Sequence, residues 1–184
     1  MFRFDISDGS EKRLTSGVGV WAAFSPDGKW IVFTRYADKV SLCKVSIDGG
    51  EPIKLFDGAG LMPAVSPDGK LIAFIGIKDK KWGMSIIPFD GGEPVKMFDT
   101  KWQSYKGGKS PLQWTPDGRA INYPVMNDNV SNIWRQPIDG GSPVQVTNFT
   151  TDQIFNFAYS PDGSQLAMSR GTFNSDVVLI ENAK

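Results

Sequence analysis

Side chains suited to catalysis are scarce in this chain of 184 residues. It has no histidine, which removes the commonest general base and the commonest metal ligand. Its single cysteine, Cys43, excludes an internal disulfide and a multi-cysteine zinc site. The Gly-x-Ser-x-Gly pattern of a nucleophilic serine does not occur. We therefore predict no catalytic residues, no cofactor site and no metal site.

Acidic and amide side chains offer one weak alternative, a calcium site. Asn127-Asp128-Asn129 has the necessary oxygen atoms, but it lacks the spacing of an EF-hand loop and a downstream acidic ligand. Four further aspartates recur along the chain, too far apart to share one metal ion, and turn geometry explains them better. These are Asp27, Asp68, Asp117 and Asp162.

Aromatic and cationic residues gather in the connection at 99–110. Exposed Trp and Tyr side chains beside cations suit a peptide, glycan or protein surface. In the alternative interpretation, the two rings fold back over the neighbouring strands. The residues concerned are Trp102, Tyr105, Lys101 and Lys106.

A repeated tetrapeptide determines which elements position these residues. It occurs as Ser25-Pro26-Asp27-Gly28 and returns at 66–69, 115–118 and 160–163, a period of about 40–50 residues. Pro, Asp and Gly in this order favour a type I turn, and the apolar runs on both sides predict a β-hairpin. A second turn, Asp-Gly-Gly, follows in step and implies another hairpin. Each repeat therefore has four strands, which in the first repeat lie near 19–25 (A), 29–35 (B), 40–47 (C) and 52–56 (D).

Four-stranded repeats without helices predict an all-β fold, a β-propeller of four-stranded blades. About four blades fall in this chain, which is one propeller domain (1–184) or part of a larger ring. Apolar positions on strand B, such as Ile31 and Phe33, should pack between neighbouring repeats, while Val32 points the other way. Residues 1–16 form the last strands of a preceding blade or a closing latch, and the remaining blades are 17–57, 58–99, 100–147 and a three-stranded 148–184.

The two most regular repeats resemble a known family. The segments FSPDGKWIVFT…KVSIDGGEPIKLF and VSPDGKLIAFI…SIIPFDGGEPVKMF look like TolB-type propeller repeats, also called PD40 or WD40-like repeats. The stretch from Phe155 to Gly163, with Ser175 to Ile180, resembles the C-terminal end of bacterial multidomain proteins. In these proteins the propeller follows a serine/threonine kinase or a winged-helix regulator domain. The resemblance implies the sensor or protein-interaction tail of a bacterial signalling protein, which is extracytoplasmic if its parent is anchored in a membrane.

Two other functions fit the same repeats. One is the gating propeller of a prolyl-oligopeptidase-type peptidase, whose hydrolase domain is not in this chain. The other is a TolB-like periplasmic scaffold of the cell envelope. Fold does not decide among these functions, so we take a non-catalytic binding or scaffolding module as the leading hypothesis.

Antiparallel pairing predicts two faces with different contents. The A–B and C–D turns lie on one face, which we call the turn face. The B–C and D–A connections, including a B–C loop at 126–129, lie on the other, the loop face, and varied loops on a rigid scaffold are where binding usually sits. We predict that a protein or peptide partner binds the loop face through Tyr36, Lys80, Trp82, Lys101, Trp102, Tyr105, Lys106, Asn127, Asp128, Arg170 and Phe173.

Charge and hydropathy narrow the range of partners. Twenty basic and twenty acidic residues balance, so no electrostatic case exists for nucleic acid. No apolar run approaches the ~20 residues of a membrane helix. We expect no secretory signal, because Met1 is followed directly by strand-like residues 2–6, and the compartment stays open. Ring closure has three alternatives: a four-bladed ring closed by residues 1–16, a part of a larger propeller, or a homodimer that completes an eight-bladed ring.

Overall fold

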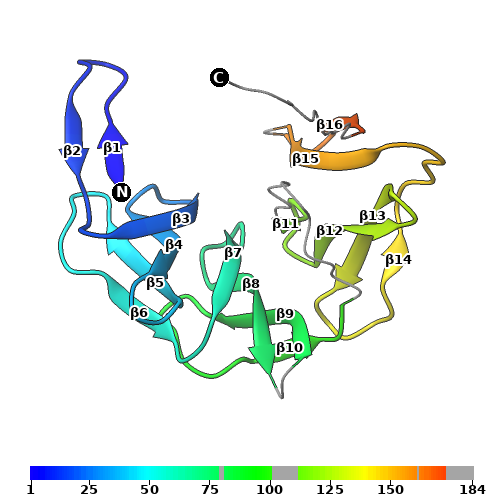
Figure 1. Cartoon of the computed structure of the whole chain (residues 1–184), viewed down its shortest axis with the longest axis horizontal. Helices are drawn as coiled ribbons and strands as arrows, with labels where there is room; N and C mark the ends of the chain where they lie inside the picture. Colours follow the sequence, from blue (N-terminus) through cyan, green and yellow to red (C-terminus); the bar gives the residue numbers. More distant parts are fainter. Residues whose placement is uncertain (79–80, 101–111, 161, 173–184) are drawn as a thin grey trace, which may run out of the picture.

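Every regular element of the described residues is a β-strand. The computed structural model describes residues 1–78, 81–100, 112–160 and 162–172. Three four-stranded and two two-stranded sheets follow one another along an arc (Figure 1). The predicted all-β propeller of four-stranded blades is thereby confirmed.

The three complete blades share the strand order A-B-C-D, with each strand antiparallel to its neighbours. The first blade consists of β3 (Val18–Phe24), β4 (Trp30–Tyr36), β5 (Ser41–Ser46) and β6 (Ile53–Phe56). The second consists of β7 (Gly60–Val65), β8 (Leu71–Lys78), β9 (Lys81–Pro88) and β10 (Lys96–Phe98). The third consists of β11 (Gln113–Trp114), β12 (Ala120–Asn127), β13 (Val130–Pro137) and β14 (Val144–Gln145).

Two hairpins flank these blades. At one end of the arc lie β1 (Phe2–Phe4) and β2 (Glu11–Arg13), and at the other lie β15 (Gln153–Tyr159) and β16 (Leu166–Gly171) (Figure 1). The limits predicted for the individual repeats and for the domain stay predictions.

The hairpin β1–β2 packs against the first blade in the same way as strands C and D of the first blade pack against the second. Arg3 donates to the Ile47 carbonyl (3.4 Å) and lies 3.8 Å from the Asp48 carboxylate. One blade further on, Lys44 of strand C makes the same two contacts with the next turn, at 3.2 Å from the Phe89 carbonyl and 2.7 Å from Asp90. A cation on strand C that holds the following Asp-Gly-Gly turn is therefore repeated between neighbours.

The repeated tetrapeptide forms the same hydrogen-bonded turn four times. In the second blade the Ser66 hydroxyl donates to Asp68 (2.6 Å), and the same carboxylate accepts from the Lys70 N–H (3.1 Å). The Leu71 N–H donates in turn to the Ser66 hydroxyl (2.9 Å). Gly69 has φ +72°, a conformation in which a Cβ would be strained. Turn chemistry therefore accounts for these aspartates.

Apolar packing between blades makes the core. Ile72 and Phe74 of β8 face the first blade and are fully buried against Val32. Ala73 and Ile75, on the opposite side of β8, face the third blade. The predicted packing of strand-B residues between repeats is confirmed. Residues on the other side of strand B, such as Val32 and Ala73, also pack between blades. Full burial of one such large side chain contributes about 2 kcal/mol.

The contact between the third blade and β15–β16 differs, because a polar residue takes the place of Val32 and Ala73. Asn122 Nδ2 donates to the Tyr159 hydroxyl (2.6 Å), and Arg135 Nε donates to Asn122 Oδ1 (3.0 Å). Asn122 is fully buried, so these bonds satisfy an amide that would otherwise be costly to bury.

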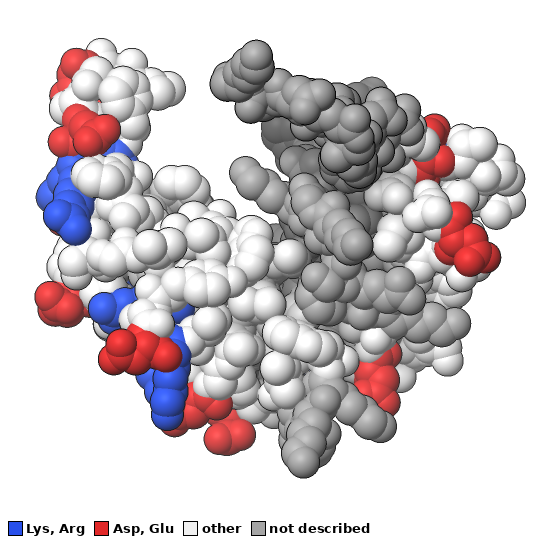
Figure 2. All heavy atoms as spheres, viewed as in Figure 1, with Lys and Arg blue, Asp and Glu red and all other residues white. Residues whose placement is uncertain are grey.

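Charged side chains lie toward the outer edge of the disc in the view of Figure 2, and the described residues nearer its centre are uncharged. Neither the basic nor the acidic side chains form a continuous patch on this face (Figure 2). This distribution matches the balanced charge of the sequence.

Candidate functional site

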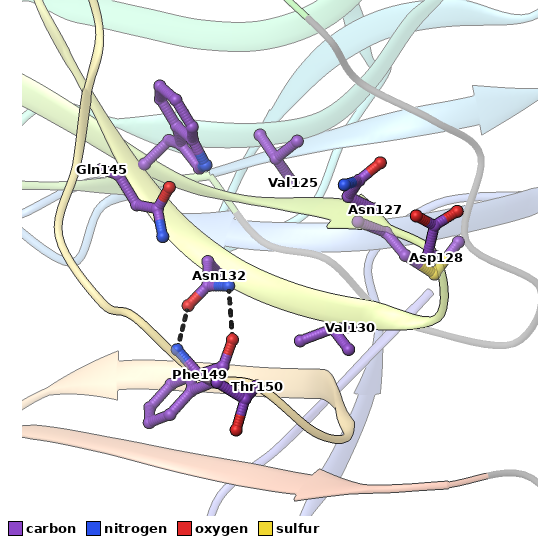
Figure 3. Close-up of a pocket in the computed structure, with 10 residues that line it drawn as sticks. Val125, Asn127, Asp128, Val130, Asn132, Gln145, Phe149 and Thr150 are labelled. Carbon is purple, nitrogen blue, oxygen red and sulfur yellow. Dashed lines mark hydrogen bonds between the residues drawn. The ribbon is translucent and has the colours of Figure 1, made fainter.

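A pocket of about 770 Å³ opens in the third blade, at the end that carries the B–C hairpin. This volume lies within the usual range of ligand sites. Strands β12 and β13 form one wall, and the chain that follows β14 forms the other (Figure 3). The described residues that line it are Val125, Met126, Asn127, Asp128, Val130, Asn132, Trp134, Gln145, Phe149 and Thr150.

The register of β12 and β13 brings the first wall together. Val125 pairs with Asn132, and Asn127 pairs with Val130 two positions nearer the turn. Alternate residues of a strand share a face, so these pairs form a ladder on one side of the hairpin. Trp134 continues the ladder inward and packs against the core between the second and third blades.

A two-residue turn ends the hairpin. Asp128 (φ 46°) and Asn129 (φ 67°) both adopt left-handed conformations, as a type I′ turn requires. Asp and Asn tolerate this conformation better than other side chains do. The predicted loop at 126–129 is therefore wrong in extent, because Met126 and Asn127 still belong to β12.

Asn132 attaches the second wall to the first (Figure 3). Its Oδ1 accepts from the Phe149 N–H (2.6 Å) and the Thr147 hydroxyl (3.0 Å). Its Nδ2 donates to the Phe149 carbonyl (3.1 Å). Arg170 holds Phe149 in addition, with the guanidinium carbon 3.5 Å from the ring centroid and a bond of 2.7 Å to the Thr151 carbonyl. The second wall is thus held through both the backbone and the ring of Phe149.

Several polar groups of the pocket have no partner within the described part of the chain. Neither Asn127 nor Asp128 makes a side-chain hydrogen bond there, and the indole N–H of Trp134 is also unpaired. Gln145 donates to the Thr147 carbonyl (2.7 Å), which leaves its Oε1 free to accept. Figure 3 shows Asn127 and Asp128 at one end of the pocket and Gln145 at the other. Such convergent unpaired groups equip a pocket to bind a ligand.

A second, apolar hollow of about 570 Å³ lies on the first blade. Val18, Val20, Trp21 and Tyr36 line it, and the Trp21 and Tyr36 ring centroids are 6.3 Å apart. Trp21 has φ 51° at a bulge of β3, an unusual conformation for so large a residue.

The residues predicted for the interaction face fall in different places. Asn127 and Asp128 lie in the pocket, Tyr36 lines the apolar hollow, and Arg170 supports Phe149 from outside the pocket lining. Trp82, on β9, is 39% exposed. The other predicted residues lie outside the described residues: Lys80, Lys101, Trp102, Tyr105, Lys106 and Phe173.

Eight of the ten described lining residues were not among the predicted interaction residues, and four of them build the pocket walls: Asn132, Trp134, Gln145 and Phe149. The signal that was available is the pair Asp128-Asn129, because a two-residue turn there fixes the register that sets Val125 opposite Asn132.

The described residues contain no group of three or more Cys, Asp or Glu side chains placed to hold a metal ion. Nor do they contain a helix long and apolar enough to span a membrane.

No protein-family model and no curated protein sequence matches the chain. Solved structures do match. A putative TolB from Agrobacterium tumefaciens is 25% identical with a TM-score of 0.65, over 91% of this chain and 63% of that chain. TolB from Acinetobacter baumannii is 20% identical with a TM-score of 0.74, over 91% and 42%. A chain of the nidogen/laminin complex is 17% identical with a TM-score of 0.66, over 92% and 66%.

These likenesses identify the architecture. The chain has the TolB-type β-propeller fold that its repeats predict. It spans less than two thirds of either TolB chain. Propeller-containing peptidases also match, but the chain covers 28% or less of them.

Proposed function

We propose that this chain is a non-catalytic binding module that holds a protein or peptide partner on its loop face. The pocket of the third blade carries the proposal. Its unpaired amide, carboxylate and indole groups converge on a space of about 770 Å³, and the described lining includes no nucleophile with an activating partner. A peptide offers the donors, acceptors and side chains that such groups bind.

The propeller neighbours support a protein-binding module. One of them is a chain of a complex between two proteins, nidogen and laminin. The described apolar hollow around Trp21 and Tyr36 adds aromatic area of the kind enriched in protein interfaces.

For the biological setting we propose the sensor or interaction tail of a larger bacterial signalling protein. A TolB-like scaffold of the periplasmic envelope is the second candidate, favoured by the likeness to two TolB chains. The peptidase alternative would leave all chemistry to another domain, since this chain has no histidine. The genes around the coding sequence distinguish these settings. A kinase or winged-helix domain in the same reading frame favours the first, and TolB-type envelope partners favour the second.

A homodimer that completes a ring stays a prediction. In its favour, β1 pairs with β2 alone among the described strands, and Phe2 and Phe4 are 58% and 61% exposed. Light scattering on a sizing column tests it, because a monodisperse monomer excludes the dimer.

Selection from a random peptide library tests the binding function. Peptides enriched on the folded chain are measured by calorimetry against paired variants of the loop face and the turn face. We expect loop-face variants such as Asn127→Ala to lose affinity while a turn-face variant such as Glu51→Gln retains it. Enrichment of no peptide, or loss of affinity only in the turn-face variants, overturns the proposal.

A further inference from the structure

We propose that the pocket of the third blade receives the basic side chain of a peptide, an alkylammonium group such as that of lysine. This inference rests on the proposed function and specifies the chemistry of its ligand. The occupant follows from three features of the described lining. These are a carboxylate without a counter-ion, apolar side chains that lead to it, and a hydrogen-bond donor and acceptor at the opposite end.

Asp128 is the only ionisable side chain among the described lining residues. The three described cations of the third and fourth blades are engaged elsewhere, and Arg119 lies beside Asp117 on the turn face. Arg135 donates to Asn122 on the side toward β15, and Arg170 donates to the Thr151 carbonyl. The Asp128 carboxylate therefore has no protein counter-ion in the described structure. A ligand cation next to it gains a charge-assisted hydrogen bond, with the adjacent Asn127 amide oxygen as a second acceptor.

An apolar path leads from the interior of the blade to this carboxylate. Trp134, Val125 and Val130 lie in order along the pocket-facing side of the hairpin. The four-carbon stem of lysine packs along such surfaces while its ammonium group stays at the polar end. The three pairs on this side span about 13 Å along the strand, and the outer step, from the Val125–Asn132 pair to the Asn127–Val130 pair, is about 7 Å, close to the reach of that stem.

The inner end of the pocket suits a peptide backbone. The indole N–H of Trp134 is available to a carbonyl, and the free Oε1 of Gln145 is available to an N–H. Trp134 and Gln145 are cross-strand neighbours, so the donor and the acceptor lie side by side. One peptide unit of the ligand satisfies both, and the adjoining basic residue, one step nearer the turn, then points its side chain along the outer part of the path toward Asp128.

The same geometry rejects other side chains. A ligand carboxylate meets Asp128 as a like charge, and an isosteric neutral chain leaves that carboxylate without its partner. We therefore expect at least tenfold preference for lysine over norleucine, and weaker binding still for glutamate.

The test is an NMR titration of the Trp134 indole N–H, which the Trp134→Phe variant assigns among the six tryptophans. The probes are three capped tripeptides, acetyl-Gly-X-Gly-amide, with lysine, norleucine or glutamate as X. We expect a saturable shift with the lysine peptide and at least tenfold weaker binding of the norleucine peptide. Asp128→Asn should reduce lysine binding to the norleucine level without unfolding the turn, because Asn also tolerates the left-handed conformation. Asp139→Asn, an exposed aspartate of the same blade on the turn face, is the matched control and should change nothing.

Two contrary results separate this inference from the proposed function. Equal binding of the three peptides overturns the lysine preference and leaves peptide binding intact. If none of them moves the indole signal while library-selected peptides bind elsewhere on the loop face, the pocket is not the recognition site. If no peptide binds by any measurement, both proposals are wrong.

Discussion

The two faces of this propeller use the same kinds of side chain in opposite ways. On the turn face, Asp68 accepts from the Ser66 hydroxyl and the Lys70 N–H, so its carboxylate is occupied by its own turn. On the loop face, Asp128 also sits in a tight turn, but its carboxylate faces a pocket without a partner among the described residues. Placement in a turn alone therefore does not identify a binding group. A polar side chain that its own backbone already satisfies is structural, and one left unpaired in a cavity is available to a ligand.

The turn face should therefore govern stability, and among its Asp-Gly-Gly turns the largest effect should come from Gly91. An added Cβ would lie 2.7 Å from the Leu55 carbonyl oxygen, at φ +89°. We expect Gly91→Ala to reduce the free energy of unfolding by about 3 kcal/mol, measured by urea denaturation.

Gly140 is the matched control, because it holds the same place in the next Asp-Gly-Gly turn but has open space around its Cβ direction (φ +104°). Gly140→Ala should cost only the conformational strain, about 1 kcal/mol. Equal losses for the two variants would show that the docking of the turn on the preceding blade contributes nothing.

A smaller loss should follow removal of the cation that holds the turn of the second blade. Lys44 is 5% exposed, and its ammonium lies between the rings of Trp30 (5.0 Å) and Phe89 (4.5 Å). We expect Lys44→Ala to cost about 2 kcal/mol, because it removes buried packing, cation–π contacts and the bond to Asp90 together. Lys54, which pairs with Asp57 on the exposed surface, serves for comparison, and Lys54→Ala should change stability by less than about 0.5 kcal/mol. If thermal denaturation shows that Lys54→Ala destabilises the fold more than Lys44→Ala does, this account of the contact between blades is wrong.

The turn aspartates should also make stability depend on pH. The Ser160 hydroxyl, with the backbone and hydroxyl of Ser164, lowers the pKa of Asp162 from 3.8 to about 2. The Ser66 hydroxyl lowers the pKa of Asp68 in the same way. A carboxyl whose pKa is depressed in the folded state stabilises the fold above its unfolded pKa, and this contribution is lost as the pH falls from about 4 to about 2. Denaturation curves at a series of pH values should show the loss, and Asp162→Asn should flatten the profile. An Asp162 chemical shift that titrates near 4 would contradict the turn geometry.

The smallest effect on stability should come from the loop face. Asn127 and Asp128 are exposed and make no side-chain hydrogen bond within the described structure, so Asn127→Ala with Asp128→Asn should change the free energy of unfolding by less than about 0.5 kcal/mol. A substantial loss in the same urea assay would show that these residues hold the fold and would weaken their assignment to binding.

The fold was predictable from the sequence because its determinants are local and repeated. Ser66-Pro67-Asp68-Gly69 and its three counterparts specify a hairpin through their own backbone preferences, and the apolar run of strand B is typical of a strand buried on both faces. The buried amide Asn122 breaks that pattern. Its partners Arg135 and Tyr159 come from two other strands, so its role emerges only once the sheets are stacked.

The pocket was only partly predictable. Asp128 was identified by its place on the loop face, but Trp134 and Gln145 carry no local pattern that separates them from ordinary strand residues. Trp134 and Gln145 face each other through the register of β13 against β14, which the connection at 138–143 sets and which no local sequence pattern specifies. The bulge at Trp21 could not be predicted from the sequence either, because large side chains rarely adopt positive φ.

The most direct test of the contrast between the faces uses two exposed aspartates of one blade. Asp128 lies on the loop face and Asp139 on the turn face, and each is replaced by Asn to keep size and turn preference. Calorimetry then measures the affinity of one library-selected peptide for the native chain and for both variants. We expect at least a tenfold loss of affinity for Asp128→Asn and no change for Asp139→Asn. An affinity that falls only in Asp139→Asn, or equally in both, would contradict the assignment of binding to the loop face.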